Sequence, residues 1–481
     1  MADLLGIGKS GLSASKKSLE VTSHNIANAN TEGYSRQKII QTSAVPVLKD
    51  GLITGTGARV VDIRRQDAPH IARRLASTIT ENEYYKERVS QLDQVEHIFN
   101  EIDSDGLHKI LNGFFNSFRE LANQPENETI RSVVRDDARM VVKDFHRIRD
   151  TLDSLARNID RKLETEVENI NQNLHFIGKL NTKIASLESV GGETGDLRDQ
   201  RDESLRNLSE YFKVHTYMDE KNRFVVSVNG VGTLVSAAEV QELGVRGTDE
   251  MTSSNGMSGS LEIFFKNRPN NPISSKIDNG RVGSLLKTRN KDIYDLQNKM
   301  DQIAYDFSHT VNAIHSKGYK STPVDPNNPE QLNKNTNILF FNTINNIKNA
   351  SMELELSDAV EQDLGNIVTA LAPNSPGDNR IALAISKLKD EKIMDNGTAT
   401  IEEQFLKSIG NVGLQSGKAR LDSEQSEGLL AQAKALKERI TGVSIDEEAA
   451  DMIRFQHAYE ASAKVLKTAD EMFRTVLDIK R

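Results

Sequence analysis

The fold is decided by residues 444–480, which read SIDEEAADMIRFQHAYEASAKVLKTADEMFRTVLDIK. Ser444 and Glu447 have the spacing of a capping box, in which each side chain accepts a hydrogen bond from the other residue's backbone N–H, so we expect a helix to begin here. Apolar residues then recur every seven positions, at Ile445, Met452, Tyr459, Leu466 and Phe473. A helix of this length spans about 50 Å. Its continuous apolar stripe predicts a packing partner, because an isolated amphipathic helix is poorly stable in water.

The N-terminal segment has the same period and is the predicted partner. Small residues between its apolar positions would let a second helix approach closely; these are Gly8, Gly11, Ser15 and Ser18. The apolar positions, again seven residues apart, are Leu5, Leu12, Leu19 and Ile26. We expect the two terminal helices to pair, and we take these four residues and the five of the C-terminal helix as the candidate assembly interface. The alternative is that both are ordinary helices packed on a globular core.

The composition of this 481-residue chain favours long helices with thin cores. Hydrophobic residues make up 37% and aromatic residues 5% of the chain, whereas 27% of its residues are charged. We therefore expect a mainly α fold with a minor β part, elongated and multi-domain, built as a long-helix, coiled-coil-like bundle. The net charge of -9, without clusters of Lys and Arg, argues against a nucleic-acid partner.

Several classes of site are not expected from the residues present. The chain has no Cys, which excludes disulfides, thiolate nucleophiles and Cys-based zinc sites. The His residues are scattered, so we expect no metal site, and we find no pattern for a cofactor or a catalytic residue. No apolar run approaches the roughly 18 residues of a membrane span, and residues 1–30 lack the apolar core of a secretory signal. These rules alone predict a cytoplasmic protein without membrane contact.

The interior of the chain predicts a long helical arm and a small β module. Helical periodicity runs over residues 129–188, and later through a helix with apolar residues seven apart, at Leu286, Ile293, Met300, Phe307 and Ile314. Between them, from residue 212 to about 265, apolar and polar side chains alternate, which is typical of strands. The run Asp199-Gln200-Arg201-Asp202 has helical spacing, and we interpret it as a solvated face of ion pairs.

These patterns divide the chain into three domains. The first is a terminal helical domain, the second a helical middle domain with long helices, and the third a small β-rich module. Their predicted bounds are 1–40 with 440–481, 41–211 with 283–439, and 212–282. Between the first two domains, residues 38–64 alternate apolar and polar side chains around glycine-containing turns, which predicts a hairpin or extended pair.

The segment after the first helix carries a motif. It reads His24-Asn25-Ile26-Ala27-Asn28-Ala29-Asn30-Thr31-Glu32-Gly33-Tyr34-Ser35-Arg36-Gln37. Its Asn residues and Gly33 favour a helix end followed by a turn. The string resembles the Asn-Ile-Ala-Asn-x-x-Thr-x-Gly-Tyr signature of the bacterial flagellar axial proteins, the family of rod, hook and hook-associated proteins.

Further blocks resemble the hook-associated branch of this family. They are Phe114-Phe115, Asp199-Gln200-Arg201-Asp202, Val282-Gly283-Ser284-Leu285-Leu286, Gly377-Asp378-Asn379, Asp446-Glu447-Glu448-Ala449-Ala450 and Thr468-Ala469-Asp470-Glu471-Met472-Phe473. The terminal blocks are shared with rod and hook proteins. The interior blocks, together with Arg36-Gln37, resemble the proteins of the hook-filament junction.

The resemblance implies a structural subunit that is not an enzyme, forms a ring at the hook-filament junction and polymerises through its terminal helices. The implied partners are other copies of the chain, the hook protein, the next hook-associated junction protein and a cytoplasmic export chaperone at the C-terminal helix. The family's terminal helices are disordered in the free subunit and fold on assembly. Export by the flagellar type III system, without a cleaved signal, then replaces the cytoplasmic location.

Three alternatives stay open from the sequence. A hook or rod subunit would share the terminal motifs, but the long arm at 129–188 and the block at 199–202 disfavour it. An axial protein with an enzymatic module, such as a muramidase or protease, would need paired carboxylates or a metal site, and the β module offers neither. A surface adhesin would predict a cleavable signal, which residues 1–30 lack.

Overall fold

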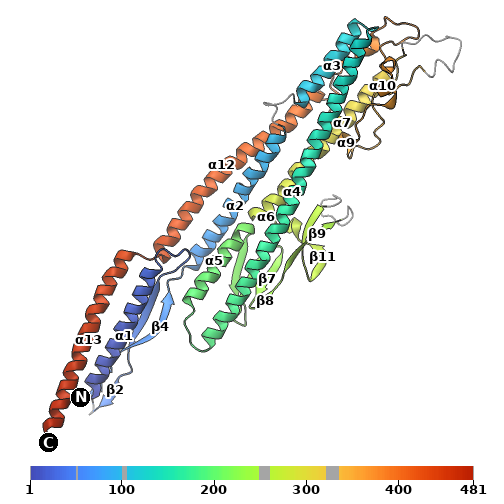
Figure 1. The fold of residues 1–481 in the computed structure, drawn as a ribbon. Helices are drawn as coiled ribbons and strands as arrows, with labels where there is room; N and C mark the ends of the chain where they lie inside the picture. The colour runs from blue at the N-terminus through green and yellow to red at the C-terminus, as the bar shows by residue number, and fades with distance from the viewer. Residues whose placement is uncertain (1, 50–51, 100–105, 249–259, 321–334, 480–481) are drawn as a thin grey trace.

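The molecule is a long rod with both chain termini at one end (Figure 1). The computed structural model describes residues 2–49, 52–99, 106–248, 260–320 and 335–479. Its longest element is α4, Glu128–Ser189, a single helix of 62 residues. At 1.5 Å per residue this helix spans about 90 Å. The expected elongated, mainly α fold with a minor β part is confirmed.

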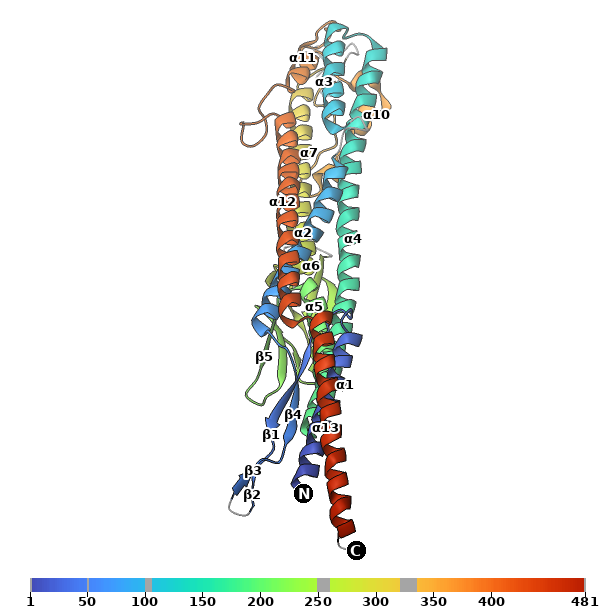
Figure 2. The same ribbon diagram turned by 90° about the vertical axis from the view of Figure 1, so that its left-hand side faces the viewer.

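The two terminal helices, α1 (Ala2–Ala27) and α13 (Ile445–Ile479), lie side by side at the end of the rod (Figure 2). Beside α1 runs an antiparallel strand pair, and a two-stranded hairpin extends from it. The strands are β1 (Gln37–Ser43), β2 (Val47–Lys49), β3 (Leu52–Thr54) and β4 (Ala58–Arg65). We call α1, β1 to β4 and α13 the terminal unit. The extended pair predicted over residues 38–64 is confirmed.

The other long helices form a bundle above the terminal unit. In Figure 1, α2 leads away from the terminal unit and α12 returns to it, and these two helices pack along their lengths. A capping box between Thr400 and Glu403 begins α12, and Gly442 follows its last residue. The bounds are α2 (Pro69–Ile98), α3 (Leu107–Asn123), α5 (Gly195–Tyr211), α6 (Gly280–Lys287), α7 (Tyr294–His315) and α12 (Ile401–Thr441).

The helix predicted around Ile293 is not regular. A π-helical turn, Thr288–Ile293, joins α6 to α7. Two side chains of this turn bind partners on other helices: Asp292 pairs with the buried Arg88 of α2, and Arg289 lies 2.5 Å from Asp160 of α4. The seven-residue period passes through the π turn without a visible break, so the sequence pattern did not reveal it.

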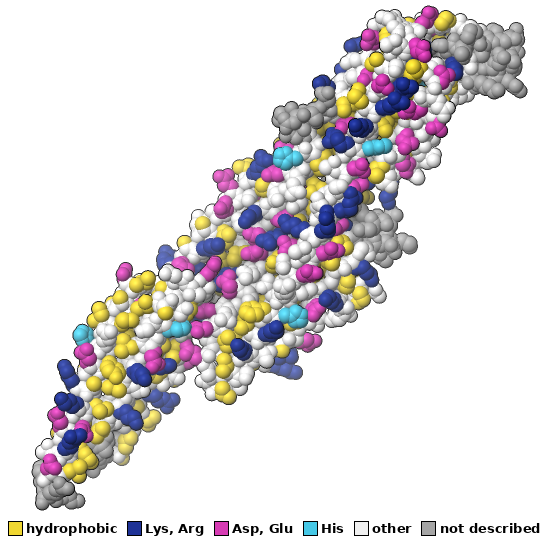
Figure 3. Space-filling model, viewed as in Figure 1, with side chains coloured by type: hydrophobic (Ala, Val, Ile, Leu, Met, Phe, Trp, Pro, Cys, Tyr) yellow, Lys and Arg dark blue, Asp and Glu magenta, His cyan; other side chains and the backbone are white. Residues whose placement is uncertain are grey.

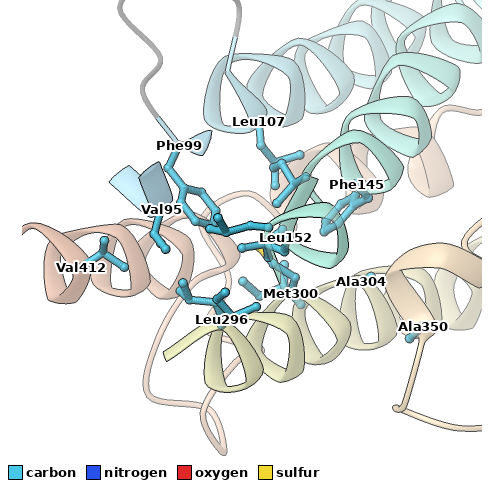
Figure 4. Packing of buried hydrophobic residues seen from close by; sticks show 14 of the residues in the cluster. Val95, Phe99, Leu107, Phe145, Leu152, Leu296, Met300, Ala304, Ala350 and Val412 are labelled. Atoms are coloured by element: carbon cyan, nitrogen blue, oxygen red, sulfur yellow. The ribbon is translucent and has the colours of Figure 1, made fainter. Parts of the chain in front are cut away.

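One continuous hydrophobic core holds the bundle together. Figure 4 shows the place where α2, α3, α4, α7 and α12 meet. The side chains that point toward one another there include Val95, Phe99, Leu107, Phe145, Leu152, Leu296, Met300 and Val412. Farther along the core, the ring of Phe114 lies 5.1 Å from that of Phe118 and 5.4 Å from that of Phe307, both in edge-to-face contact.

The β module forms two antiparallel sheets, with strand orders β5-β6-β7-β8 and β9-β10-β11. It is docked on α4, where Asn171 donates to the carbonyl of Leu243 at 2.8 Å and accepts from its N–H at 2.9 Å. Gly178 allows the close approach, since a Cβ there would lie 3.0 Å from Val240. The bounds are β5 (Val214–Met218), β6 (Phe224–Val228), β7 (Gly232–Ser236), β8 (Glu239–Val240), β9 (Leu243–Thr248), β10 (Ser260–Phe265) and β11 (Arg268–Pro272).

Short helices complete the bundle, with α10 and α11 near the end of the rod opposite the termini (Figure 2). They are α9 (Ala350–Glu353), α10 (Asp358–Gln362), α11 (Arg380–Lys387) and the 3-10 turns Ser274–Lys276 and Leu364–Asn366. In the described part of the chain, none of the helices is both apolar and long enough to span a membrane.

Candidate assembly interface

The seam between α1 and α13 is built on small residues. A Cβ at Gly8 would lie 3.3 Å from the Cα of Leu466, and one at Gly11 would lie 2.8 Å from the hydroxyl of Ser462. Larger side chains at these two positions would force the helices apart, because glycine alone brings the backbones this close. The close approach expected at Gly8 and Gly11 is therefore present.

The nine residues predicted as the assembly interface are only partly covered within one subunit. Six of them are half-buried: Leu5, Leu12, Leu19, Ile26, Met452 and Leu466. The other three are exposed: Ile445, Tyr459 and Phe473. The structure brings the two rows onto adjacent helices, yet the fully buried positions of the seam are others, among them Ala14, Val21 and Ala469.

The terminal helices expose further large apolar side chains. On α1 these are Leu4 and Ile7, and on α13 they are Ile453, Val465, Met472, Val476 and Leu477. Figure 3 shows hydrophobic side chains spread over this helix pair at the lower left of the molecule. Contiguous exposed apolar surface on a soluble protein marks a site of protein–protein contact. The helix pair thus leaves large apolar side chains of both helices uncovered within one subunit.

The motif after α1 folds into a closed hydrogen-bond network centred on Asn25. The buried Asn25 amide donates to the carbonyl of Gln37 and to the carboxylate of Glu448, both at 2.9 Å. Its oxygen accepts from the Tyr34 hydroxyl at 2.8 Å and from the Gln37 N–H at 3.0 Å. All four hydrogen-bonding positions of the amide are used. The network ties the end of α1, the turn after it and the start of α13 together.

Arg36 continues this network along α13. Its guanidinium lies 2.6 Å from Glu447 and 2.6 Å from Glu448, and 3.6 Å from Asp451. Its backbone N–H donates to the carbonyl of Thr441 at 2.9 Å, so the motif also holds the link between α12 and α13. One half of the expected capping box is present, since Glu447 N–H donates to Ser444 at 3.4 Å. The Glu447 carboxylate, expected to reach back to Ser444, binds Arg36.

The block at 199–202 is not the solvated face that we expected. Asp199 and Arg201 are buried. The Asp199 carboxylate accepts from the Ser35 N–H at 3.0 Å and from Arg65 of β4 at 2.8 Å, and Arg65 also lies 2.6 Å from Asp202. The prediction was wrong because helical spacing alone does not show that another chain segment covers this face of α5.

The pKa values of Arg65 and Tyr34 reflect this packing. Burial opposes the charged form of Arg65, but the carboxylates of Asp202, Asp67 and Asp199 raise its pKa above the ordinary value, so the guanidinium stays charged. Burial, and then the charges of Asp196 and Asp199, raise the pKa of Tyr34, so its hydroxyl stays protonated and can donate to Asn25.

We call Asn25, Arg36, Arg65, Asp199 and Glu448 the polar joint. It connects α1, α13, β4 and α5, and so fixes the terminal unit on the bundle. The sequence motifs include Asn25, Arg36, Asp199 and Glu448, but the sequence predicted no contact among them and did not single out Arg65. The available signal was the polar Asn25 at the end of an apolar helical row, a position where Asn is unfavourable unless it is hydrogen-bonded.

Clustered metal ligands and perturbed ionisable groups are two common signs of a chemical site. No group of three or more His, Asp or Glu side chains in the described residues is placed to hold a metal ion. The perturbed groups of the polar joint are engaged in ion pairs and hydrogen bonds between elements, which is the structural cause of such shifts.

Comparison with known proteins identifies the family. Residues 92–328 match the family model of the flagellar hook-associated protein FlgK helical domain. Residues 5–34 match the model of the flagella basal body rod protein, and residues 439–479 match the C-terminal model of the flagellar basal body rod FlgEFG protein. Flagellar hook-associated protein 1 of Bacillus subtilis is 26% identical over 98% of this chain and 97% of its own length. The chain belongs to the family of flagellar hook-associated protein 1.

Other members of the hook-associated protein 1 family match over the same length. The protein of Salmonella typhimurium is 23% identical, with 100% of both chains covered. Among solved structures, the flagellar hook junction protein FlgK from Burkholderia pseudomallei superposes with a TM-score of 0.60 at 14% identity and covers 77% of this chain and 100% of its own. This likeness shows the shared fold. The relatives are flagellar structural proteins, which is consistent with a chain that is not an enzyme.

Proposed function

We propose that this chain is a structural subunit of the hook-filament junction, where copies form a ring and join the hook to the filament through their terminal helices. The observation that carries the proposal is the uncovered apolar surface of the α1/α13 pair. A two-helix unit that exposes apolar side chains on both helices is stabilised when neighbouring helix pairs cover them. The nine predicted residues and the exposed residues of α13 would make these contacts.

The polar joint supports different roles for the terminal helices and for the rest of the chain. We propose that the terminal helical domain, with the predicted bounds 1–40 and 440–481, enters the axial tube, while the helical middle domain and the β module stay outside it. Hydrogen bonds and ion pairs at Asn25, Arg36 and Arg65 fix the orientation of α1 and α13 on the bundle. Directional bonds of this kind set an angle between two bodies more strictly than apolar contacts do.

The partners that we propose are those that the family resemblance implies. They are other copies of the chain, the hook protein on one side and the next hook-associated junction protein on the other. We also propose export by the flagellar type III system without a cleaved signal. An export chaperone at α13 is supported by the large exposed side chains of that helix, such as Ile453 and Leu477, which need cover before assembly.

The experiment replaces two exposed apolar residues of α13, Tyr459→Asp with Phe473→Asp, in cells that carry the variant as the only copy. Buried carboxylates without partners are unfavourable, so we expect export into the medium and loss of attached filaments. The matched control is Thr468→Asp, an acidic change at an exposed polar position of the same helix. Normal filaments on the double variant would rule out α13 as the assembly surface.

A location measurement separates the junction from the other axial positions. An epitope in the β module, labelled on intact flagella, should give a single band between hook and filament. Label along the whole hook or in the rod would favour a hook or rod subunit, which is the alternative that shares the terminal motifs.

A further inference from the structure

The helix α12 carries apolar and small residues on two opposite faces, and only one of these faces is covered within the subunit. Its inner face packs on α2 through small and apolar residues, among them Ser408, Val412, Ser416, Ala419, Ser426 and Ala433. Its outer face carries four leucines at intervals of eight, seven and eight residues, which places them along one side of the helix. Leu406, Leu414, Leu421 and Leu429 are 47%, 74%, 68% and 41% exposed.

Four glycines lie on the same outer side, in the stretch between Leu406 and Leu429. They are Gly410, Gly413, Gly417 and Gly428. A Cβ at each of the four would meet no atom within 4 Å, so nothing inside the subunit requires glycine there. Glycine weakens a helix relative to alanine, so four of them in one helix call for a compensating contact.

The same chain shows what glycine does at a helix contact. At the seam of the terminal unit, Gly8 and Gly11 bring α1 against Leu466 and Ser462 of α13. On α12 the glycines are interspersed among large leucines, so the outer face has projecting side chains with gaps between them. A helix that carries apolar and small residues on opposite faces belongs between two layers. The inner layer is α2, and the outer layer is not supplied by the described residues of the subunit.

The dimensions of this face indicate what covers it. With 41 residues α12 is about 60 Å long, and a helix is about 10 Å wide, so one face offers on the order of 600 Å². A specific interface buries about 800 Å² on each partner. The face therefore approaches this size only if a partner covers its whole length. Because α12 forms one long edge of the molecule in Figure 1 and lies toward the viewer in Figure 2, that partner is a rod lying alongside. The chain itself is such a rod.

We propose that the outer face of α12, defined by Leu406, Leu414, Leu421 and Leu429 with the glycines between them, binds a second copy of this chain lengthwise. The proposal rests on the proposed function in that copies stand side by side in a ring. It adds a contact in the bundle, outside the terminal helices, which would hold neighbouring subunits together along their outer parts.

The test uses a crosslinker on the outer face in assembled flagella. Because the chain has no Cys, Glu424→Cys introduces a single thiol on the exposed side of α12, which takes a benzophenone maleimide label. After irradiation we expect a covalent dimer whose crosslinked peptides both come from this chain. Crosslinks only to a different protein, or no intermolecular crosslink in assembled flagella, would overturn the proposal.

A second variant tests the α12 contact separately from the terminal interface on α13. Leu414→Asp with Leu421→Asp should lower the yield of attached filaments at least tenfold, while the thermal unfolding temperature and the exported amount stay as in the wild type. Val190→Asp, at an exposed apolar position of the turn after α4, is the matched control and should assemble normally. If the α12 variant assembles like the wild type while the α13 variant does not, the terminal interface stands and the α12 contact is wrong. If the α13 variant also assembles, the proposed terminal interface is wrong as well.

Discussion

Within the polar joint, the side chain of Asn25 uses all of its hydrogen-bonding positions. Its amide donates two hydrogen bonds and accepts two, and one of its partners is the buried carboxylate of Glu448. A neutral amide is the group that can serve a carbonyl, a carboxylate and two donors at once. Position 25 therefore requires both the shape and the neutrality of Asn.

We predict that Asn25→Asp loosens the terminal unit although the side chain keeps its shape. The new carboxylate would replace the amide that lies 2.9 Å from Glu448 and would face the carbonyl of Gln37 without a donor. An unpaired buried charge costs roughly 3 kcal/mol of stability. Hydrogen exchange of α1 and α13 should become faster, whereas Asn30→Asp, in the exposed part of the same motif, should leave it unchanged. Equal exchange in both variants would mean that Asn25 is not needed to hold α1 and α13 in place.

At the level of elements, the sequence predicted what depends on local pattern. The extent of α4, predicted over residues 129–188, the strands after residue 212 and the start of α13 at Ser444 were all visible as periodicity and caps. The burial of Asp199 was not visible, because its partners Ser35 and Arg65 lie far away in sequence. The nine interface residues stay a prediction, since their final neighbours belong to other subunits.

Between elements, Arg281 joins four helices of the bundle. From α6 it reaches Glu83 of α2 at 2.6 Å, Glu210 of α5 at 3.0 Å and Glu166 of α4 at 3.4 Å. We predict that Arg281→Met lowers the free energy of unfolding by about 3 kcal/mol, because three carboxylates lose their common partner. Arg420→Met, which breaks exposed pairs with Asp93 and Glu96, should cost much less, because solvent screens exposed charges. Urea unfolding of both variants measures the difference, and equal losses would contradict it.

The C-terminal end of α7 is fixed by the fully buried His315. Its Nδ1 lies 2.8 Å from the carbonyl of Ile338, and its Nε2 accepts from the Val368 N–H at 3.0 Å, so the ring is neutral. Burial, with a smaller effect of Arg131, lowers the pKa of His315 from 6.5 to about 4. The folded protein therefore resists protonation that the unfolded chain accepts.

We predict an acid-dependent loss of stability from this residue. Its contribution is complete above pH 6.5, falls as the pH drops toward about 4 and is constant below that. The total is about 3 kcal/mol for this shift. Urea unfolding at pH 7, 5.5 and 4 should show this slope in the wild type and a weaker slope in His315→Gln. The same slope in both proteins would mean that other groups titrate in this range.

In the whole molecule, stability is concentrated away from the assembly surface. Among the described residues, the continuous core contains side chains of the bundle and the β module and none of the terminal unit. Amide exchange follows local stability, and thin elements with exposed apolar side chains open more easily than a packed core. In a free subunit the helical bundle should therefore stay ordered, while the amides of the terminal helices exchange quickly.

We predict that amides of residues 2–27 and 445–479 exchange at least about 100-fold faster in the free subunit than those around Leu152 in α4, which is fully buried. In assembled flagella the terminal helices should become as protected as α4, because neighbouring helix pairs then cover their apolar flanks. The amides of the bundle serve as the internal control, since their protection should not change. Terminal helices that are already as protected as the core in the free subunit would contradict folding on assembly. The polar joint and the seam at Gly8 and Gly11 would then be enough to hold the terminal unit, and assembly would have to use a surface that is ordered before the subunits meet.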